Sequence, residues 1–254
     1  MRILPKAQRE GMYEIYSFCH QVDNVADSGM SREHKLTILS QWRSKIAALY
    51  VGNIGTQLEP LSRVVQRFSL RQNDFIAIID GMEMDVVNTV VAPDRNTLDL
   101  YCDRVASAVG RLSVKVFGMP DDDGLKLAHH LGRALQLTNI LRDIDEDAAV
   151  GRFYLPRDML VEAGLTHLTP YSICDESLDR ACAPLIANAR EHFSQATKIM
   201  RQYPRYVVIA PRIMAQVYYA LLKQLVQRGF AVPRKPVRVS RTSLMLAIVK
   251  HYLF

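Results

Sequence analysis

The sequence predicts an all-α protein. Apolar residues recur at helical spacing along nearly the whole chain, and residues that stop helices stand between the periodic segments. No segment alternates convincingly in the way a half-buried strand does, and no glycine-rich phosphate loop occurs. With 254 residues, 49% hydrophobic and 23% charged, the composition is that of a globular protein and excludes a disordered chain.

The periodicity predicts eight helices, most of them followed by a recognisable helix breaker. Ser31 marks the predicted start of the second helix, and the glycine-containing segment 52–55 follows that helix. Pro93, Pro120 and Pro156 stand after the fourth, fifth and sixth helices. The predicted ranges are 7–28, 31–50, 57–70, 73–89, 96–117, 124–149, 177–202 and 205–228.

The chain shows no linker and no solenoid repeat, so we expect one domain over residues 1–254. Its tail, residues 231–241, is rich in Arg and Lys, and residues 243–254 are predicted to form an apolar helix. The favoured interpretation is a solvated connection followed by a docking helix. The alternative is a basic collar that contacts anionic lipid head groups.

Charge and cysteine usage limit the partners and the compartment. Thirty-two Lys and Arg against 26 Asp and Glu give a net charge of +6. This charge suits an anionic ligand or a membrane surface and is too weak to indicate nucleic acid. The four cysteines form no C-x-x-C pair, and no apolar run reaches the roughly 20 residues of a membrane span. We expect a cytoplasmic protein that touches the inner face of the membrane at most.

Two predicted helices carry acidic stripes, because residues spaced by three or four positions share one helix face. The stripe on the first helix comprises Tyr16, His20, Asp23 and Asp27. The stripe on helix 124–149 comprises Gln136, Asn139, Asp143 and Asp147, with Glu146 beside them.

The carboxylates of these stripes predict a magnesium–diphosphate site. Like charges four residues apart weaken a helix, and the second stripe is flanked by large apolar residues, where carboxylates seldom occur unless paired or bound to metal. If both stripes face one cleft, their oxygen ligands suit Mg²⁺ together with substrate phosphate. A solvated helix face and a carboxylate acid/base pair of the glycosidase kind are the alternatives.

The motifs resemble those of the squalene and phytoene synthase family, all-helical enzymes that join two prenyl diphosphates head to head. The first acidic motif is CHQVDNVADS, and the second, with the segment after it, is LQLTNILRDIDEDAAVGRFYLP. Two further segments match the family pattern, IIDGMEMDV and YCDRVASAVGRLSVKVFG. Within the family, the chain looks most like the bacterial branch that forms presqualene diphosphate for hopanoid biosynthesis.

The resemblance implies an isoprenoid synthase-type helical bundle around a central cavity. It implies a farnesyl-diphosphate farnesyltransferase that condenses two farnesyl diphosphates into presqualene diphosphate, with several Mg²⁺ ions bridging the substrate diphosphate and no NADPH. Squalene-forming enzymes would act downstream. A phytoene synthase acting on geranylgeranyl diphosphate, a head-to-tail prenyl elongase and a non-catalytic binding or assembly relative are the alternatives.

The resemblance also implies roles for individual residues. The metal ligands would be Asp23, Asp27, Asn139, Asp143 and Asp147. The four aspartates and Tyr101, which matches a tyrosine near the reacting carbons, would be the catalytic residues. Substrate would contact Tyr16, His20, Val105, Ala106, Ala108, Gln136, Asn139, Arg142, Arg152 and Tyr218.

The chain departs from the family pattern at several positions. Asn24 stands where an Asp is usual, His20 where an Arg is common, and Ser107 where a Gly is frequent. Relatives usually have a further upstream stretch that closes over the substrate. In the family pattern, Met1 of this chain already falls inside the expected first helix. We therefore expect this N-terminal lid to be missing.

Overall fold

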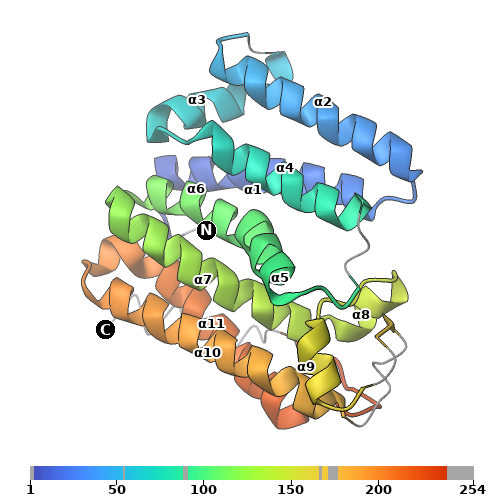
Figure 1. Ribbon diagram of the computed structural model, residues 1–254. Helices are drawn as coiled ribbons and strands as arrows, with labels where there is room; N and C mark the ends of the chain where they lie inside the picture. The colour runs from blue at the N-terminus through green and yellow to red at the C-terminus, as the bar shows by residue number, and fades with distance from the viewer. Residues whose placement is uncertain (1–2, 54, 88–90, 166–167, 171–176, 239–254) are drawn as a thin grey trace. The chain divides into compact units, whose positions relative to one another are not determined.

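The structure is a computed structural model that describes residues 3–53, 55–87, 91–165, 168–170 and 177–238. These residues form helices and no strand (Figure 1), which confirms the all-α prediction. An isolated parallel bridge joins Val91 to Phe153. The chain divides into two compact units, one of residues 1–88 and 103–132, and the other of residues 89–102 and 133–254.

The first unit is a set of helices around an aromatic cluster. Phe18 packs edge-on against Trp42 and Phe75, with ring centroids 5.7 and 5.1 Å apart, and α4 packs against α1, α2 and α6 (Figure 1). Its elements are α1 (Lys6–Asp27), α2 (Arg32–Tyr50), η1 (Thr56–Leu58), α3 (Glu59–Phe68), α4 (Gln72–Val87), the π-helical turn η2 (Asp103–Ser107), α6 (Ala108–Phe117) and the first part of α7 (Asp121–Arg142).

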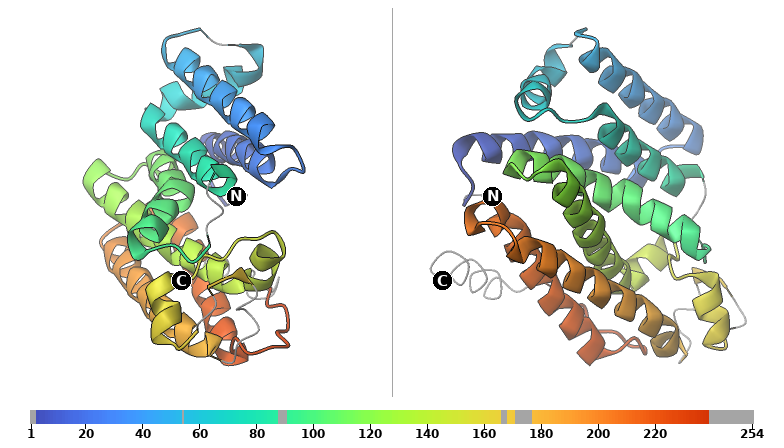
Figure 2. Two further views of the ribbon diagram at one scale, coloured as in Figure 1. Left: turned by 45° about the vertical axis from the view of Figure 1, so that its right-hand side comes forward. Right: turned by 60° about the vertical axis from the view of Figure 1, so that its left-hand side comes forward.

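The second unit is built on two long antiparallel helices, α10 and α11, which lie side by side in both views of Figure 2. The bridge segment is fixed where the amide of Ala92 donates to the carbonyl oxygen of Phe153 at 2.8 Å. The elements are α5 (Arg95–Cys102), the end of α7, α8 (Ile144–Ala149), α9 (Arg157–Glu162), α10 (Leu178–Arg201) and α11 (Arg205–Arg228).

Apolar periodicity located the long helices to within a few residues. The hydroxyl of Ser31 accepts a hydrogen bond from the amide of His34 at 3.3 Å, which confirms the predicted start of α2. The short helix α9 was not predicted. The apolar helix predicted for residues 243–254 lies outside the described residues. Among the residues described, no helix is long and apolar enough to cross a membrane.

Two predicted helices are interrupted. The segment predicted as one helix over 96–117 contains the π-helical turn η2. The prediction missed this turn because five residues of π-helix do not change the apolar pattern enough to be detected. The predicted helix 124–149 ends at Arg142 and resumes at Ile144, with Asp143 between at φ −98° and ψ 18°. The prediction of one continuous helix beneath the second stripe was therefore wrong. The amide of Asp147 still donates to the carbonyl oxygen of Asp143 at 2.8 Å.

Candidate functional site

The first acidic stripe lies on the exposed face of α1, in the first unit. Tyr16, His20, Asp23 and Asp27 are all exposed, whereas the apolar face of the helix is buried. The rings of Tyr16 and His20 are stacked with centroids 5.9 Å apart. The side-chain nitrogen of Asn24 lies 3.3 Å from Nε2 of His20, so these two departures from the family pattern contact each other.

The predicted tunnel residues lie on and just after η2, also in the first unit. Val105 and Ala106 are half-buried, and Ala108 is fully buried. A Cβ atom on Gly81 of α4 would lie only 2.6 Å from Cγ1 of Val105, so α4 approaches η2 as closely as a glycine permits. Because Gly81 has no side chain, the π-helical turn can pack directly against α4.

The second acidic stripe surrounds the junction of α7 and α8, in the second unit. Nε of Arg142 donates to Oδ1 of Asp143 at 2.6 Å, and Nη2 donates to Oδ2 at 2.5 Å. Neighbouring side chains on a regular helix do not face each other, so the changed backbone at Asp143 accompanies this bidentate contact. Hydrogen bonding to Asp143 raises the pKa of Arg142, and Tyr218 adds a further hydrogen bond to the same guanidinium.

Asn139 stands one turn before this pair and carries an unsatisfied acceptor. Its Oδ1 atom is buried and has no hydrogen-bond partner among the described residues. Gln136, one turn earlier, is half-buried. A buried amide oxygen without a donor costs free energy unless a ligand satisfies it, and such an oxygen is a suitable ligand for a hard cation. This observation fits a magnesium ion at the junction.

The rest of the stripe follows in α8 and the turn after it. Asp147 is half-buried, and its carbonyl oxygen accepts from the amide of Arg152 at 2.8 Å. This bond closes the turn that ends α8, and Arg152 in that turn is half-buried.

Tyr101 is buried at the end of α5 and is paired with Tyr154. The two rings are stacked with centroids 4.9 Å apart, and the hydroxyl of Tyr101 donates to that of Tyr154 at 3.1 Å. Tyr154 was not predicted as a site residue, although it belongs to the quoted motif GRFYLP. Its place in that motif was the available signal.

A second contact missed by the sequence analysis joins the tail to the acidic segment. Arg234 donates to Oδ2 of Asp145 from Nε at 2.9 Å and to Oδ1 from Nη2 at 2.5 Å. The Arg234 side chain is 1% exposed, and its guanidinium lowers the pKa of Asp145. Arg234 is therefore not an exposed cation of a basic collar, because its buried side chain is ion-paired to the more exposed Asp145 of α8.

Comparison with known proteins gives a family and a set of relatives. The squalene/phytoene synthase family model matches residues 1–243. The presqualene diphosphate synthase of Rhodopseudomonas palustris is 54% identical over 253 residues, which are 99% of this chain and 90% of the relative. That of Sinorhizobium fredii is 53% identical over 254 residues, with 100% and 91% covered.

More distant matches include a relative by sequence and a solved structure with a similar fold. The phytoene synthase of Mycobacterium tuberculosis is 34% identical over 169 residues, which cover 65% of this chain and 54% of the relative. A crystal structure of a squalene synthase from Alicyclobacillus acidocaldarius superposes with a TM-score of 0.81 at 24% identity, covering 90% of this chain and 87% of that one. The helical fold is thus shared with solved synthases of this kind.

Proposed function

Because the chain belongs to the squalene/phytoene synthase family, we propose that it joins two farnesyl diphosphates head to head into presqualene diphosphate. The other products are diphosphate and a proton. The observation that carries this proposal is the closer match, over the whole chain, to presqualene diphosphate synthases than to phytoene synthases. A phytoene synthase acting on geranylgeranyl diphosphate is therefore the second candidate.

Each acidic stripe would supply oxygen ligands for magnesium. The proposed ligands are Asp23 and Asp27 on α1, Asp143 and Asp147 around the α7–α8 junction, and Oδ1 of Asn139. The unsatisfied oxygen of Asn139 supports this assignment from the structure. When bound, magnesium neutralises charge on the leaving diphosphate.

Arg142 is the proposed diphosphate contact on the second stripe. Its guanidinium is held in one orientation by Asp143 and Tyr218, and the side chain remains 30% exposed. A planar guanidinium matches two oxygens of a phosphate group, and prior orientation reduces the entropy lost on binding. Arg142 would therefore hold the diphosphate while the carbon–oxygen bond breaks.

The reacting carbons need an environment without water. An allylic cation reacts with water unless the second prenyl chain reaches it first. Val105 and Ala106 are apolar and half-buried, and with the fully buried Ala108 they are the proposed lining for the prenyl chains. The only polar groups of the Tyr101 and Tyr154 side chains are their hydroxyls, and the hydroxyl of Tyr101 donates a hydrogen bond to that of Tyr154.

The proton released on ring closure is assigned to the departing diphosphate. A neutral phenol such as Tyr101 is a much weaker base than a diphosphate anion. The hydroxyl of Tyr101 also already donates to Tyr154, which fixes the orientation of its ring. Tyr101 would thus orient the reacting chains and leave proton removal to the product.

Turnover of the full chain with defined substrates tests this proposal. Farnesyl diphosphate is supplied with magnesium or with EDTA, and products are identified by mass spectrometry. We expect presqualene diphosphate only with magnesium. Preferred conversion of geranylgeranyl diphosphate would favour the phytoene synthase, and substrate binding without turnover would favour the non-catalytic relative.

A further inference from the structure

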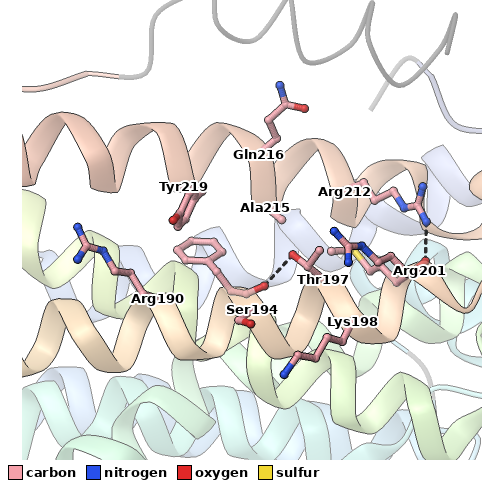
Figure 3. A pocket seen from close by; sticks show the side chains of 11 residues that line it. Arg190, Ser194, Thr197, Lys198, Arg201, Arg212, Ala215, Gln216 and Tyr219 are labelled. Atoms are coloured by element: carbon pink, nitrogen blue, oxygen red, sulfur yellow. Dashed lines mark hydrogen bonds between the residues drawn. The ribbon is translucent and has the colours of Figure 1, made fainter.

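A groove between α10 and α11 has no role in the proposed reaction (Figure 3). Its volume is about 640 Å³, and all of its lining residues belong to the second unit. Four cationic side chains line it, and no acidic one does: Arg190, Lys198, Arg201 and Arg212.

The cations are arranged along the groove. Arg190, Lys198 and Arg201 share one face of α10, because they are spaced by eight and three residues. Figure 3 shows Arg201 and Arg212 together at one end of the groove and Arg190 towards the other. Nη2 of Arg212 donates to the carbonyl oxygen of Met200 at 2.6 Å, which fixes its guanidinium at that end.

These charges are not neutralised within the described part of the chain. None of the four forms an ion pair there with an acidic side chain. Burial lowers the pKa of Arg212, and so does repulsion from Arg205 and Arg201. Cations held together against their own repulsion favour an anionic ligand.

The groove is too large for a phosphate ion alone. Its volume falls within the range of sites for whole organic ligands. Part of its lining is apolar, including the rings of Phe193 and Tyr219, which meet edge-on with centroids 5.4 Å apart. Tyr219 is also 36% exposed. A ligand with a phosphate head and an apolar body matches both parts of the lining.

We propose that this groove binds the phosphate head group of an anionic phospholipid and so attaches the α10–α11 face to a bilayer. The cations contact the phosphate, and the exposed ring of Tyr219 contacts the start of the acyl chains. This inference does not depend on the reaction that the protein catalyses. Each cation near an anionic bilayer strengthens binding by about fivefold, so loss of two weakens it by about thirtyfold.

The test is co-sedimentation of the full chain with vesicles of phosphatidylcholine, with and without phosphatidylglycerol. The variant Lys198→Gln/Arg201→Gln removes two groove charges. The variant Arg63→Gln/Arg67→Gln removes two exposed charges from α3 and is the matched control for net charge. Melting temperature and turnover without vesicles are measured for both and should match the wild type.

We expect the wild type to bind only vesicles that contain phosphatidylglycerol, the groove variant to bind about thirtyfold more weakly, and the α3 variant to bind nearly as the wild type does. Equal weakening of both variants would overturn the proposal, since net charge alone would then explain binding. No binding by the wild type would also overturn it.

Two further arms separate other anions from a lipid. Inorganic phosphate is tested for stabilisation of the wild type beyond that given by sodium chloride at equal ionic strength. Stabilisation lost in the groove variant would assign the groove to a soluble phosphate and overturn the lipid. Tighter binding to polyglutamate than to vesicles, also lost in the groove variant, would replace the lipid with an acidic protein.

Discussion

Substitution of Gly132 by alanine tests how η2 is held in place. A Cβ atom on Gly132 of α7 would lie 2.7 Å from Cα and 2.8 Å from the backbone nitrogen of Ser107, the last residue of η2. These are backbone atoms, which cannot rotate away. Gly124, earlier on the same helix, is the matched control, because its Cβ would first meet a side-chain atom, Cγ2 of Val114, at 3.2 Å.

The expected magnitude follows from two opposing effects. Replacement of glycine by alanine within a helix stabilises it by up to about 1 kcal/mol. Overpacking that shifts the backbone costs about 3 kcal/mol at the upper end of its usual range. Gly132→Ala should therefore lower the free energy of unfolding by about 2 kcal/mol, and Gly124→Ala should leave it unchanged or raise it slightly.

Thermal melts followed by circular dichroism measure this difference. For a chain of this size, about 2 kcal/mol corresponds to a melting temperature lower by roughly 4–8 °C. Turnover of Gly132→Ala at a temperature where it is folded should also fall, because η2 carries Val105 and Ala106. A melting temperature equal to or above that of the wild type would refute the reasoning, since the close approach would then be relieved without cost.

Three other predictions concern the site. Asp143→Asn should lower turnover at least about a hundredfold with the fold intact, whereas the exposed Asp122→Asn should leave turnover nearly unchanged; equal activities would contradict the metal assignment. Tyr101→Phe should retain turnover within about tenfold, and a loss of about a hundredfold or more would instead identify its hydroxyl as the base. Arg234→Gln should destabilise the protein at neutral pH, because Arg234 lowers the pKa of Asp145. The stability that this ion pair contributes is present above the ordinary carboxyl pKa and is lost as the pH falls through the lowered pKa of Asp145. The difference in melting temperature should therefore shrink as the pH falls below the ordinary carboxyl pKa, and a difference independent of pH would argue against this ion pair.

The helices were predictable because their apolar residues repeat over many turns. The burial of Phe18 and the exposure of Asp23 on opposite sides of α1 follow from that repeat. Helix α9 was missed because its six residues, Arg157–Glu162, are too short to show a period. The π-helical turn at Asp103–Ser107 was missed because it keeps the helical pattern and changes only its local winding.

The acidic residues of the candidate site were visible as stripes, but their partners were not. The bidentate contact of Arg142 with Asp143 requires a backbone change between two helices that the sequence pattern treats as one. The Arg234–Asp145 ion pair joins residues 89 positions apart, and local spacing carries no information on such a contact. Tyr101 was identified through the family resemblance, whereas its stacked partner required the structure.

In the proposed reaction two farnesyl units enter one product, and mixed isotopic labelling tests this most directly. The full chain is incubated with magnesium and equal amounts of unlabelled farnesyl diphosphate and farnesyl diphosphate deuterated in a terminal methyl group. We expect presqualene diphosphate carrying one labelled and one unlabelled chain, beside the unlabelled and doubly labelled forms. Products that contain a single farnesyl unit, or no mixed-label presqualene diphosphate, would contradict head-to-head condensation.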